Sequence, residues 1–247
     1  PGDDLRFFDW RIYGRSDRLF VKQFQEERNL AAYLCLDVSR SMDWRSRDAG
    51  LVTKLEYGRR VCAAFALLLA RQGDAVGLVC VDDAVRRWLP ARAAPNRWRE
   101  VVRALVETEP GVRTAPESAL HELANRVPGR GCVVLVSDLL AEPAAVVEGL
   151  VRLRHAGHHV LVFHLLDPGE RELPPVGDAI FVDPETGADV PARSSELRDA
   201  YRRAVVEAID GWRTTLGAHG IEYELLETDR ALAPALRAFL ARRARWR

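Results

Sequence analysis

The chain has 247 residues, of which 48% are hydrophobic, and its 36 lysines and arginines balance its 36 aspartates and glutamates. This length allows one large domain or two small ones, with enough apolar side chains for a sizeable core. The lack of a basic excess argues against a nucleic-acid-binding protein, whose affinity depends on neutralising phosphates. No apolar run approaches the ~20 residues of a membrane-spanning helix, so we expect no membrane span.

The first part of the chain, residues 1–29, is polar, aromatic and arginine-rich, and it shows little periodicity. We interpret it as an N-terminal arm and residues 30–247 as one α/β domain. That domain begins with a strongly apolar strand predicted over residues 30–36. A helix is predicted over residues 54–72, where apolar residues recur at helical spacing before Gly73 and Asp74.

Predicted strands and helices alternate along most of the remaining chain. This alternation predicts a doubly wound, mostly parallel sheet with helices on both faces and one short antiparallel edge strand, over residues 85–90. A hairpin is also predicted over residues 179–190, around a Pro-Glu-Thr-Gly turn. The other predicted strands cover residues 75–81, 132–136, 159–165 and 221–226, and the other helices cover 97–106, 117–126, 142–155, 195–219 and 231–243.

Four cysteines stand singly inside apolar segments, without any Cys-x-x-Cys pair. We therefore expect buried, reduced thiols and a cytoplasmic protein. The cysteines are Cys35, Cys62, Cys80 and Cys132.

A D-x-S-x-S motif, formed by Asp37, Ser39 and Ser41, follows the first buried strand directly. It gathers one carboxylate and two hydroxyls, and such hard oxygen ligands suit Mg²⁺, with Mn²⁺ or Ca²⁺ as alternatives, better than zinc. Three ligands with a single charge cannot fill the shell of a divalent cation. Positions would remain for water or for an acidic group of another molecule.

Two further segments carry oxygen ligands toward the same edge of the predicted sheet. Asp138 follows the buried strand Cys-Val-Val-Leu-Val-Ser, and Thr114 lies in a loop just before a helix. In doubly wound sheets, ligands bind beyond the carboxyl ends of the strands. The sequence alone also allows roles in helix capping and turns for each of these residues, including a capping box between Thr114 and Glu117.

These motifs, in this order, resemble the von Willebrand factor A domain and its metal-ion-dependent adhesion site. More narrowly, the chain resembles the bacterial family DUF58 over nearly its whole length. The resemblance rests on the arm PGDDLRFFDWRIYGRSDRLFVKQFQEE and on LDVSRSM, RQGDAVGLV and VLVSDLL. The family pattern begins upstream of Pro1, so we expect further residues before it. The resemblance implies a vWA/Rossmann-like fold with Asp37, Ser39 and Ser41 as core metal ligands, Thr114 bound directly or through water, and Asp138 bound mainly through water.

The threonine loop departs from the family pattern, in which Gly-Gly usually precedes the threonine. Here Arg113 precedes Thr114. This difference bears on the flexibility of the loop and on the placement of Thr114.

The resemblance further implies a non-enzymatic, Mg²⁺-dependent module that binds an aspartate or glutamate of a protein partner. The expected partner is a MoxR-type AAA+ ATPase or its client, and the expected role is that of an adaptor in chaperone-like maturation or assembly. The alternative is a Mg²⁺-dependent hydrolase or phosphotransferase with Asp37 as nucleophile. Against it, Ser39 occupies the place of a second acid, the chain has no G-x-x-x-x-G-K-[ST] phosphate loop, and we expect no lysine near Asp138 to balance a phosphate.

Overall fold

A six-stranded sheet forms the centre of the computed structural model, with strand order β3-β2-β1-β4-β5-β8. The structure describes residues 31–46, 50–111, 116–172, 178–182 and 189–243. The central strand β1 (Ala31–Asp37) pairs in parallel with β2 (Ala75–Val81) on one side and with β4 (Gly131–Ser137) on the other. On the far side of β4, β5 (His159–Leu166) and β8 (Glu222–Glu227) continue the parallel pairing.

The edge strand β3 (Val85–Arg92) is antiparallel to β2, as the sequence predicts, and ends two residues later than expected. The predicted hairpin is also present, as the antiparallel pair β6 (Asp178–Val182) and β7 (Asp189–Arg193). The expected α/β architecture is therefore confirmed. The arm, residues 1–29, lies outside the described residues.

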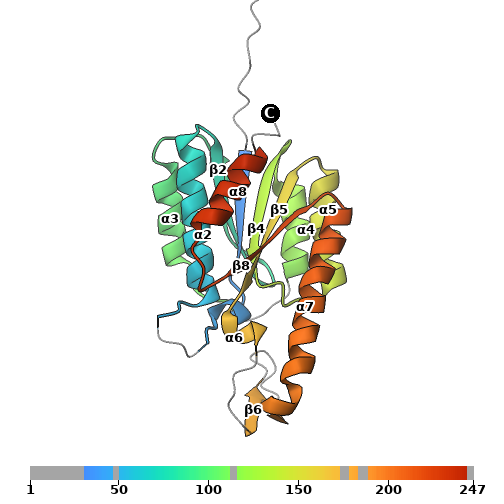
Figure 1. The fold of residues 1–247 in the computed structure, drawn as a ribbon. Coiled ribbons are helices and arrows are strands. Elements are labelled where there is room, and N and C mark those ends of the chain that lie inside the picture. Colours follow the sequence, from blue (N-terminus) through green and yellow to red (C-terminus); the bar gives the residue numbers. More distant parts are fainter. Residues whose placement is uncertain (1–30, 47–49, 112–115, 173–177, 183–188, 244–247) are drawn as a thin grey trace, which may run out of the picture.

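Helices cover both faces of the six-stranded sheet (Figure 1). Neighbouring strand residues point to opposite faces, so β1 sends Leu34 and Leu36 to one core and Tyr33 and Cys35 to the other. The first core is closed by α2 (Lys54–Arg71), α3 (Arg97–Glu107) and α8 (Ala233–Arg243). The second is closed by α4 (Pro116–Arg126), α5 (Pro143–His155) and α7 (Ser194–Ala218).

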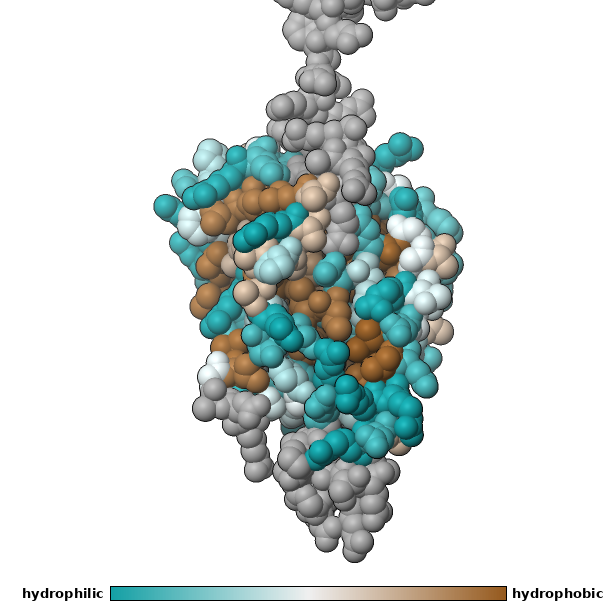
Figure 2. Space-filling model, in the orientation of Figure 1, coloured by the Kyte–Doolittle hydropathy of each residue, from teal (hydrophilic) through white to brown (hydrophobic). Residues whose placement is uncertain are grey.

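The central strands are almost completely buried, which explains why their sequences are continuous apolar runs rather than alternating ones. The four cysteines are buried free thiols, as expected, three in strands and Cys62 in α2. The helices are amphipathic instead, and Figure 2 shows hydrophilic side chains over much of one face of the molecule, with smaller apolar areas between them. No helix of the described residues is both long and apolar enough to cross a bilayer.

Two short elements at the carboxyl edge of the sheet were not predicted from the sequence. The 3-10 helix η2 (Arg40–Asp43) follows β1, and the single turn α6 (Pro168–Arg171) follows β5. Asp167 caps α6 through a reciprocal capping box with Glu170. The first of them, η2, carries Ser41 of the candidate site described next, and α6 borders that site.

Candidate metal centre

The two acidic residues predicted for the site end neighbouring strands. Asp37 is the last residue of β1, and Asp138 directly follows β4, which pairs with β1 in parallel. The chain passes from β1 outward to β2 and β3 and then returns to β4 on the other side of β1, so the strand order reverses here. This is the topological switch point at which doubly wound sheets bind ligands.

The D-x-S-x-S loop folds its three side chains into one buried cluster. Asp37 Oδ1 accepts a hydrogen bond from the Ser39 backbone N–H at 2.9 Å, and the Ser39 and Ser41 hydroxyls lie 3.1 Å apart. All three residues are at least 96% buried, with exposures of 1%, 0% and 4%. Ser39 precedes η2 in the N-cap position, yet its side chain makes no capping bond. The capping role that the sequence allows is therefore absent for Ser39.

Asp138 does not cap the following helix either. The residue in the N-cap position of α5 is Glu142, and Asp138 Oδ1 instead accepts the Leu140 N–H at 3.3 Å within its own turn. Between these residues, Leu139 adopts a φ of 54°, which is unusual for a side chain of its size. Such strain costs of the order of 1–3 kcal/mol and tends to occur at functional sites.

Ser137 also belongs to the cluster, although no sequence motif predicted it. Its hydroxyl donates to Asp37 Oδ2 at 2.6 Å and accepts the Leu139 N–H at 3.0 Å. The serine thereby joins the end of β1 to the turn that carries Asp138. The sequence places Ser137 next to Asp138, but which strand faces it depends on the sheet order.

Lys54 corrects one expectation from the sequence, that no lysine lies near Asp138. It is the first residue of α2, and its Nζ lies 2.8 Å from Asp138 Oδ2, with a second ion pair to Glu170 Oε1. The Lys54 side chain is completely buried. The expectation failed because Lys54 stands 84 residues before Asp138 in the chain.

Burial, and after it the neighbouring charge of Asp138, raise the pKa of Asp37 to about 6. Hydrogen bonds from Ser137 and Ser39 act in the opposite direction but do not outweigh the burial. In the part of the chain that the structure describes, no positive charge compensates that of the Asp37 carboxylate. A divalent cation bound here would supply that charge and lower the pKa again.

The donors of the cluster fit a hard cation. Asp37 contributes a carboxylate and Ser39 and Ser41 contribute hydroxyls, all oxygen ligands of the type that Mg²⁺ and Mn²⁺ prefer. In the described part of the chain, no group of three or more histidines, cysteines, aspartates or glutamates is arranged to hold a metal. A site of one or two carboxylates completed by hydroxyls would not form such a group.

Thr114, the fourth residue predicted for the site, lies outside the described residues. The chain leading toward it is anchored at Gly111, whose N–H donates to the Val38 carbonyl oxygen at 2.6 Å. A Cβ on Gly111 would lie only 2.3 Å from Asp82 Oδ2. A larger residue than glycine at position 111 would therefore clash with Asp82, at the point where the threonine loop meets the D-x-S-x-S loop.

A cavity of about 450 Å³ opens beside Asp138. Its polar lining includes His164, Glu170 and Tyr201, and Trp212 forms part of its apolar wall. Burial lowers the pKa of His164 to about 4, so this histidine is neutral near pH 7, and its Nδ1 lies 2.7 Å from the Tyr223 hydroxyl. The cavity beside Asp138 is therefore lined by neutral, acidic and apolar side chains.

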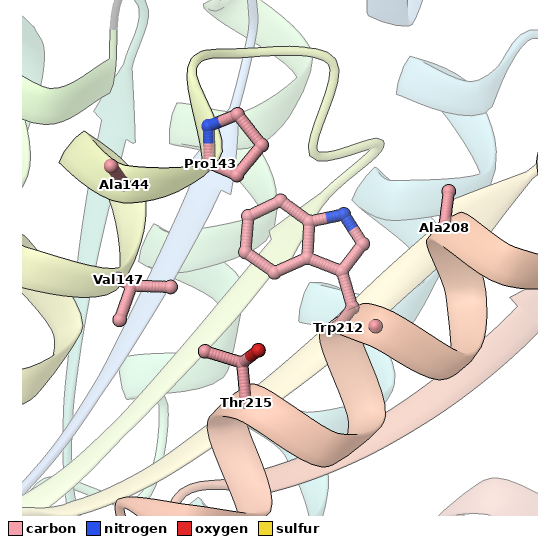
Figure 3. A pocket seen from close by; sticks show the side chains of 7 residues that line it. Pro143, Ala144, Val147, Ala208, Trp212 and Thr215 are labelled. Carbon is pink, nitrogen blue, oxygen red and sulfur yellow. The ribbon is translucent and has the colours of Figure 1, made fainter.

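A second hollow of about 380 Å³ lies between α5 and α7 and shares Trp212 with the first. Figure 3 shows the Trp212 ring reaching from α7 toward Pro143 at the start of α5, with Val147 and Thr215 nearby. The two hollows share lining residues, and Asp138 lines only the first.

Comparison with known proteins supports the sequence resemblance and the fold. The chain is 30% identical over 250 residues to the uncharacterized protein Rv1480 of Mycobacterium tuberculosis and to Mb1516 of Mycobacterium bovis, covering 99% of this chain and 77% of each relative. The crystal structure of BatB, a conserved hypothetical protein from Bacteroides thetaiotaomicron, has a TM-score of 0.57 at 16% identity and covers 87% of this chain and 99% of that one. An aerotolerance-related membrane protein from Bacteroides fragilis has a TM-score of 0.54 at 18% identity, with 80% and 91% covered. Residues 1–209 match the family described as "Protein of unknown function DUF58", and the chain belongs to this family.

Proposed function

We propose that the protein is a metal-dependent interaction module that binds an acidic residue of a protein partner. The observation that carries this proposal is the buried cluster of Asp37, Ser39 and Ser41 at the switch point of the sheet. Asp37 would hold the cation through its charge, and the two hydroxyls would complete one side of the shell. When bound, the ion would supply an electrophilic centre for an incoming carboxylate.

The composition of the donor set favours a ligand from outside the chain. Hydroxyls carry no charge, so a divalent cation held by Asp37, Ser39 and Ser41 would retain a net positive charge. A partner's aspartate or glutamate would neutralise it and occupy a remaining position. Asp138, which already accepts bonds from Lys54 and from Leu140, is better placed to hold a metal-bound water than to bind the ion directly.

The partner class follows from the sequence resemblance, which implies a MoxR-type AAA+ ATPase or one of its clients. On this proposal the chain acts as a cytoplasmic adaptor in the maturation or assembly of other complexes. The four free, buried cysteines are compatible with a reducing compartment.

A calorimetric titration with MgCl₂ tests the metal site. We expect Asp37→Ala to abolish binding and leave the fold intact, as judged by circular dichroism, because the variant removes the charged ligand of the D-x-S-x-S loop. Unchanged Mg²⁺ affinity in this variant would remove the proposal.

A binding assay with a purified MoxR-type ATPase tests the partner. We expect retention of the ATPase by the wild type with Mg²⁺, and its loss with a chelator or in Ser39→Ala/Ser41→Ala. Equal retention by both proteins regardless of metal would place the contact elsewhere on the chain.

The second candidate is a Mg²⁺-dependent phosphotransferase with Asp37 as nucleophile, and Lys54 beside Asp138 is the observation that favours it. Aspartate-nucleophile phosphatases use a lysine to balance the phosphate. Here, however, Lys54 already pairs with two carboxylates, and Ser39 stands where the second acid would be. Turnover of p-nitrophenyl phosphate that requires Mg²⁺ and disappears in Asp37→Asn would establish this candidate over the first.

A further inference from the structure

Lys54 brings a fixed positive charge into the candidate metal centre. Thr53 caps α2 by accepting the Glu56 N–H, and this cap places Lys54 at the first position of the helix. The lysine side chain is fully buried, and its Nζ contacts Asp138 Oδ2 at 2.8 Å. A buried ammonium of this kind is stable only when paired, so Asp138 and Lys54 stabilise each other.

Glu170 is a second, independently positioned partner of the same ammonium. Its Oε1 pairs with Lys54, and its Oε2 accepts the Asp167 N–H at 3.0 Å in the capping box of α6. Asp167 is itself fixed, because its carboxylate accepts the backbone N–H groups of Ser46 and Gly169. The charge of Lys54 is therefore divided between Asp138, which borders the metal ligands, and Glu170, which does not belong to them.

We propose that Lys54 acts as a tethered cation, that is, a positively charged side chain fixed in the site, whose ammonium pairs with Asp138 and thereby lowers the affinity of the site for a divalent ion. Glu170 weakens this competition because it pairs with the same ammonium. The inference rests on the proposed metal site and adds a residue that sets its affinity. An ammonium and a divalent ion near the same carboxylate repel each other and compete for its oxygens. This repulsion is strong where water is excluded, as it is around Lys54.

The two sides of this arrangement predict opposite effects. In Lys54→Met, Asp138 loses its internal cation, so we expect Mg²⁺ to bind about tenfold more tightly than in the wild type. In Glu170→Gln, Lys54 pairs with Asp138 alone, so we expect Mg²⁺ to bind about fivefold more weakly. A role of Lys54 in positioning Asp138 for the metal would give the reverse result for Lys54→Met.

Two control variants separate the contact from a general change in charge. Arg60→Met removes an exposed positive charge from the same helix as Lys54, where Arg60 pairs with the exposed Glu56 instead of Asp138. Glu172→Gln removes an exposed negative charge two residues beyond Glu170. We expect each control to change the Mg²⁺ affinity less than about twofold, because exposed charges are screened by solvent and salt.

Calorimetric titration with MgCl₂ measures the affinities, and the shift in thermal midpoint on adding MgCl₂ gives a second readout. We expect this shift to be larger for Lys54→Met than for the wild type, because Mg²⁺ replaces the missing charge. If Lys54→Met does not fold without metal, recovery of its folded signal with MgCl₂ supports the inference, and Glu170→Gln supplies the affinity test.

The outcomes distinguish this inference from the proposed function. If the wild type binds Mg²⁺ and the affinity stays the same or falls in Lys54→Met, the inference about Lys54 is overturned and the metal site still stands. The same holds if the affinity does not fall in Glu170→Gln. Binding that is seen only in Lys54→Met supports the inference strongly. Absence of binding in the wild type and in Lys54→Met overturns both.

Discussion

The hydroxyl of Ser137 donates a 2.6 Å hydrogen bond to Asp37 Oδ2, and this bond joins the carboxyl ends of β1 and β4. Both residues are almost completely buried. The same hydroxyl accepts the N–H of Leu139, the residue with the left-handed backbone conformation. One serine thus links the proposed metal ligand, the strained turn and Asp138.

Ser137→Ala tests the importance of this link for stability. Asp37 would lose a hydrogen bond to a charged oxygen, and we expect the free energy of unfolding at pH 7 to fall by about 1.5–3 kcal/mol. Urea denaturation measures this change. Ser46→Ala is a matched control, since the buried Ser46 hydroxyl has no hydrogen-bond partner in the described part of the chain. A loss for Ser137→Ala that is no larger than for Ser46→Ala would contradict the argument.

The raised pKa of Asp37 predicts how the stability of the metal-free protein depends on pH. The pKa is about 6 in the folded chain against 3.8 for a free group, so the folded state holds this proton more tightly than the unfolded state. The contribution of Asp37 to stability is therefore greatest at low pH and is lost as the pH rises through 6. Asp37→Asn removes this effect, because asparagine does not titrate in this range.

Urea denaturation in the presence of a chelator measures the effect of Asp37 on stability. We expect the gain in stability of Asp37→Asn over the wild type to grow by about 2 kcal/mol between about pH 4.5 and about pH 7.5. With added Mg²⁺, the difference in stability between Asp37→Asn and the wild type should depend less on pH, because the cation compensates the Asp37 charge in the wild type. A gain that is independent of pH would show that Asp37 ionises normally in the folded protein.

Gly111→Ala tests the junction between the threonine loop and the D-x-S-x-S loop. The new Cβ would lie 2.3 Å from Asp82 Oδ2, so either Asp82 or the backbone that hydrogen-bonds to Val38 must move. We expect a loss of about 1–3 kcal/mol in stability and weaker Mg²⁺ binding.

A double-mutant cycle with Asp82→Ala isolates this contact. When the Asp82 carboxylate is absent, the cost of Gly111→Ala should shrink, which gives a coupling energy of at least about 0.5 kcal/mol. Strictly additive losses would mean that the clash with Asp82 does not determine the need for glycine.

Gly131→Ala tests the close pairing of β1 and β4 at the end opposite the candidate site. A Cβ here would lie 2.3 Å from the Ala31 carbonyl oxygen, which belongs to the neighbouring backbone. We expect a loss of stability of at least about 2 kcal/mol, with Mg²⁺ affinity unchanged.

Gly211→Ala, within α7, is the control for Gly131→Ala, since among the described residues no atom beyond its chain neighbours and the adjacent helix backbone lies within 4 Å of its added Cβ. It should be neutral or stabilise the protein by up to about 1 kcal/mol, because alanine favours helix. Chemical denaturation measures both variants. Equal stabilities for the two would refute the close approach of the strands at Gly131.

The elements that the sequence predicted best are those whose pattern is set by burial. The apolar runs of β2 and β4 and the helical spacing of α2 were predicted to within one residue at each end. The short elements η2 and α6 were missed because four residues are too few to show a period. Their positions depend instead on local capping, as in the Asp167–Glu170 box.

The sequence by itself determined the D-x-S-x-S cluster, because Asp37, Ser39 and Ser41 lie within five consecutive residues and a single loop brings them together. It also placed Asp138 at the correct edge, since parallel strands end on the same side of a sheet. Only the tertiary structure decided that Lys54 pairs with both Asp138 and Glu170. Their ion pairs span 84 and 116 residues, and they form because α2, β4 and α6 meet at one edge of the sheet, which no local pattern encodes.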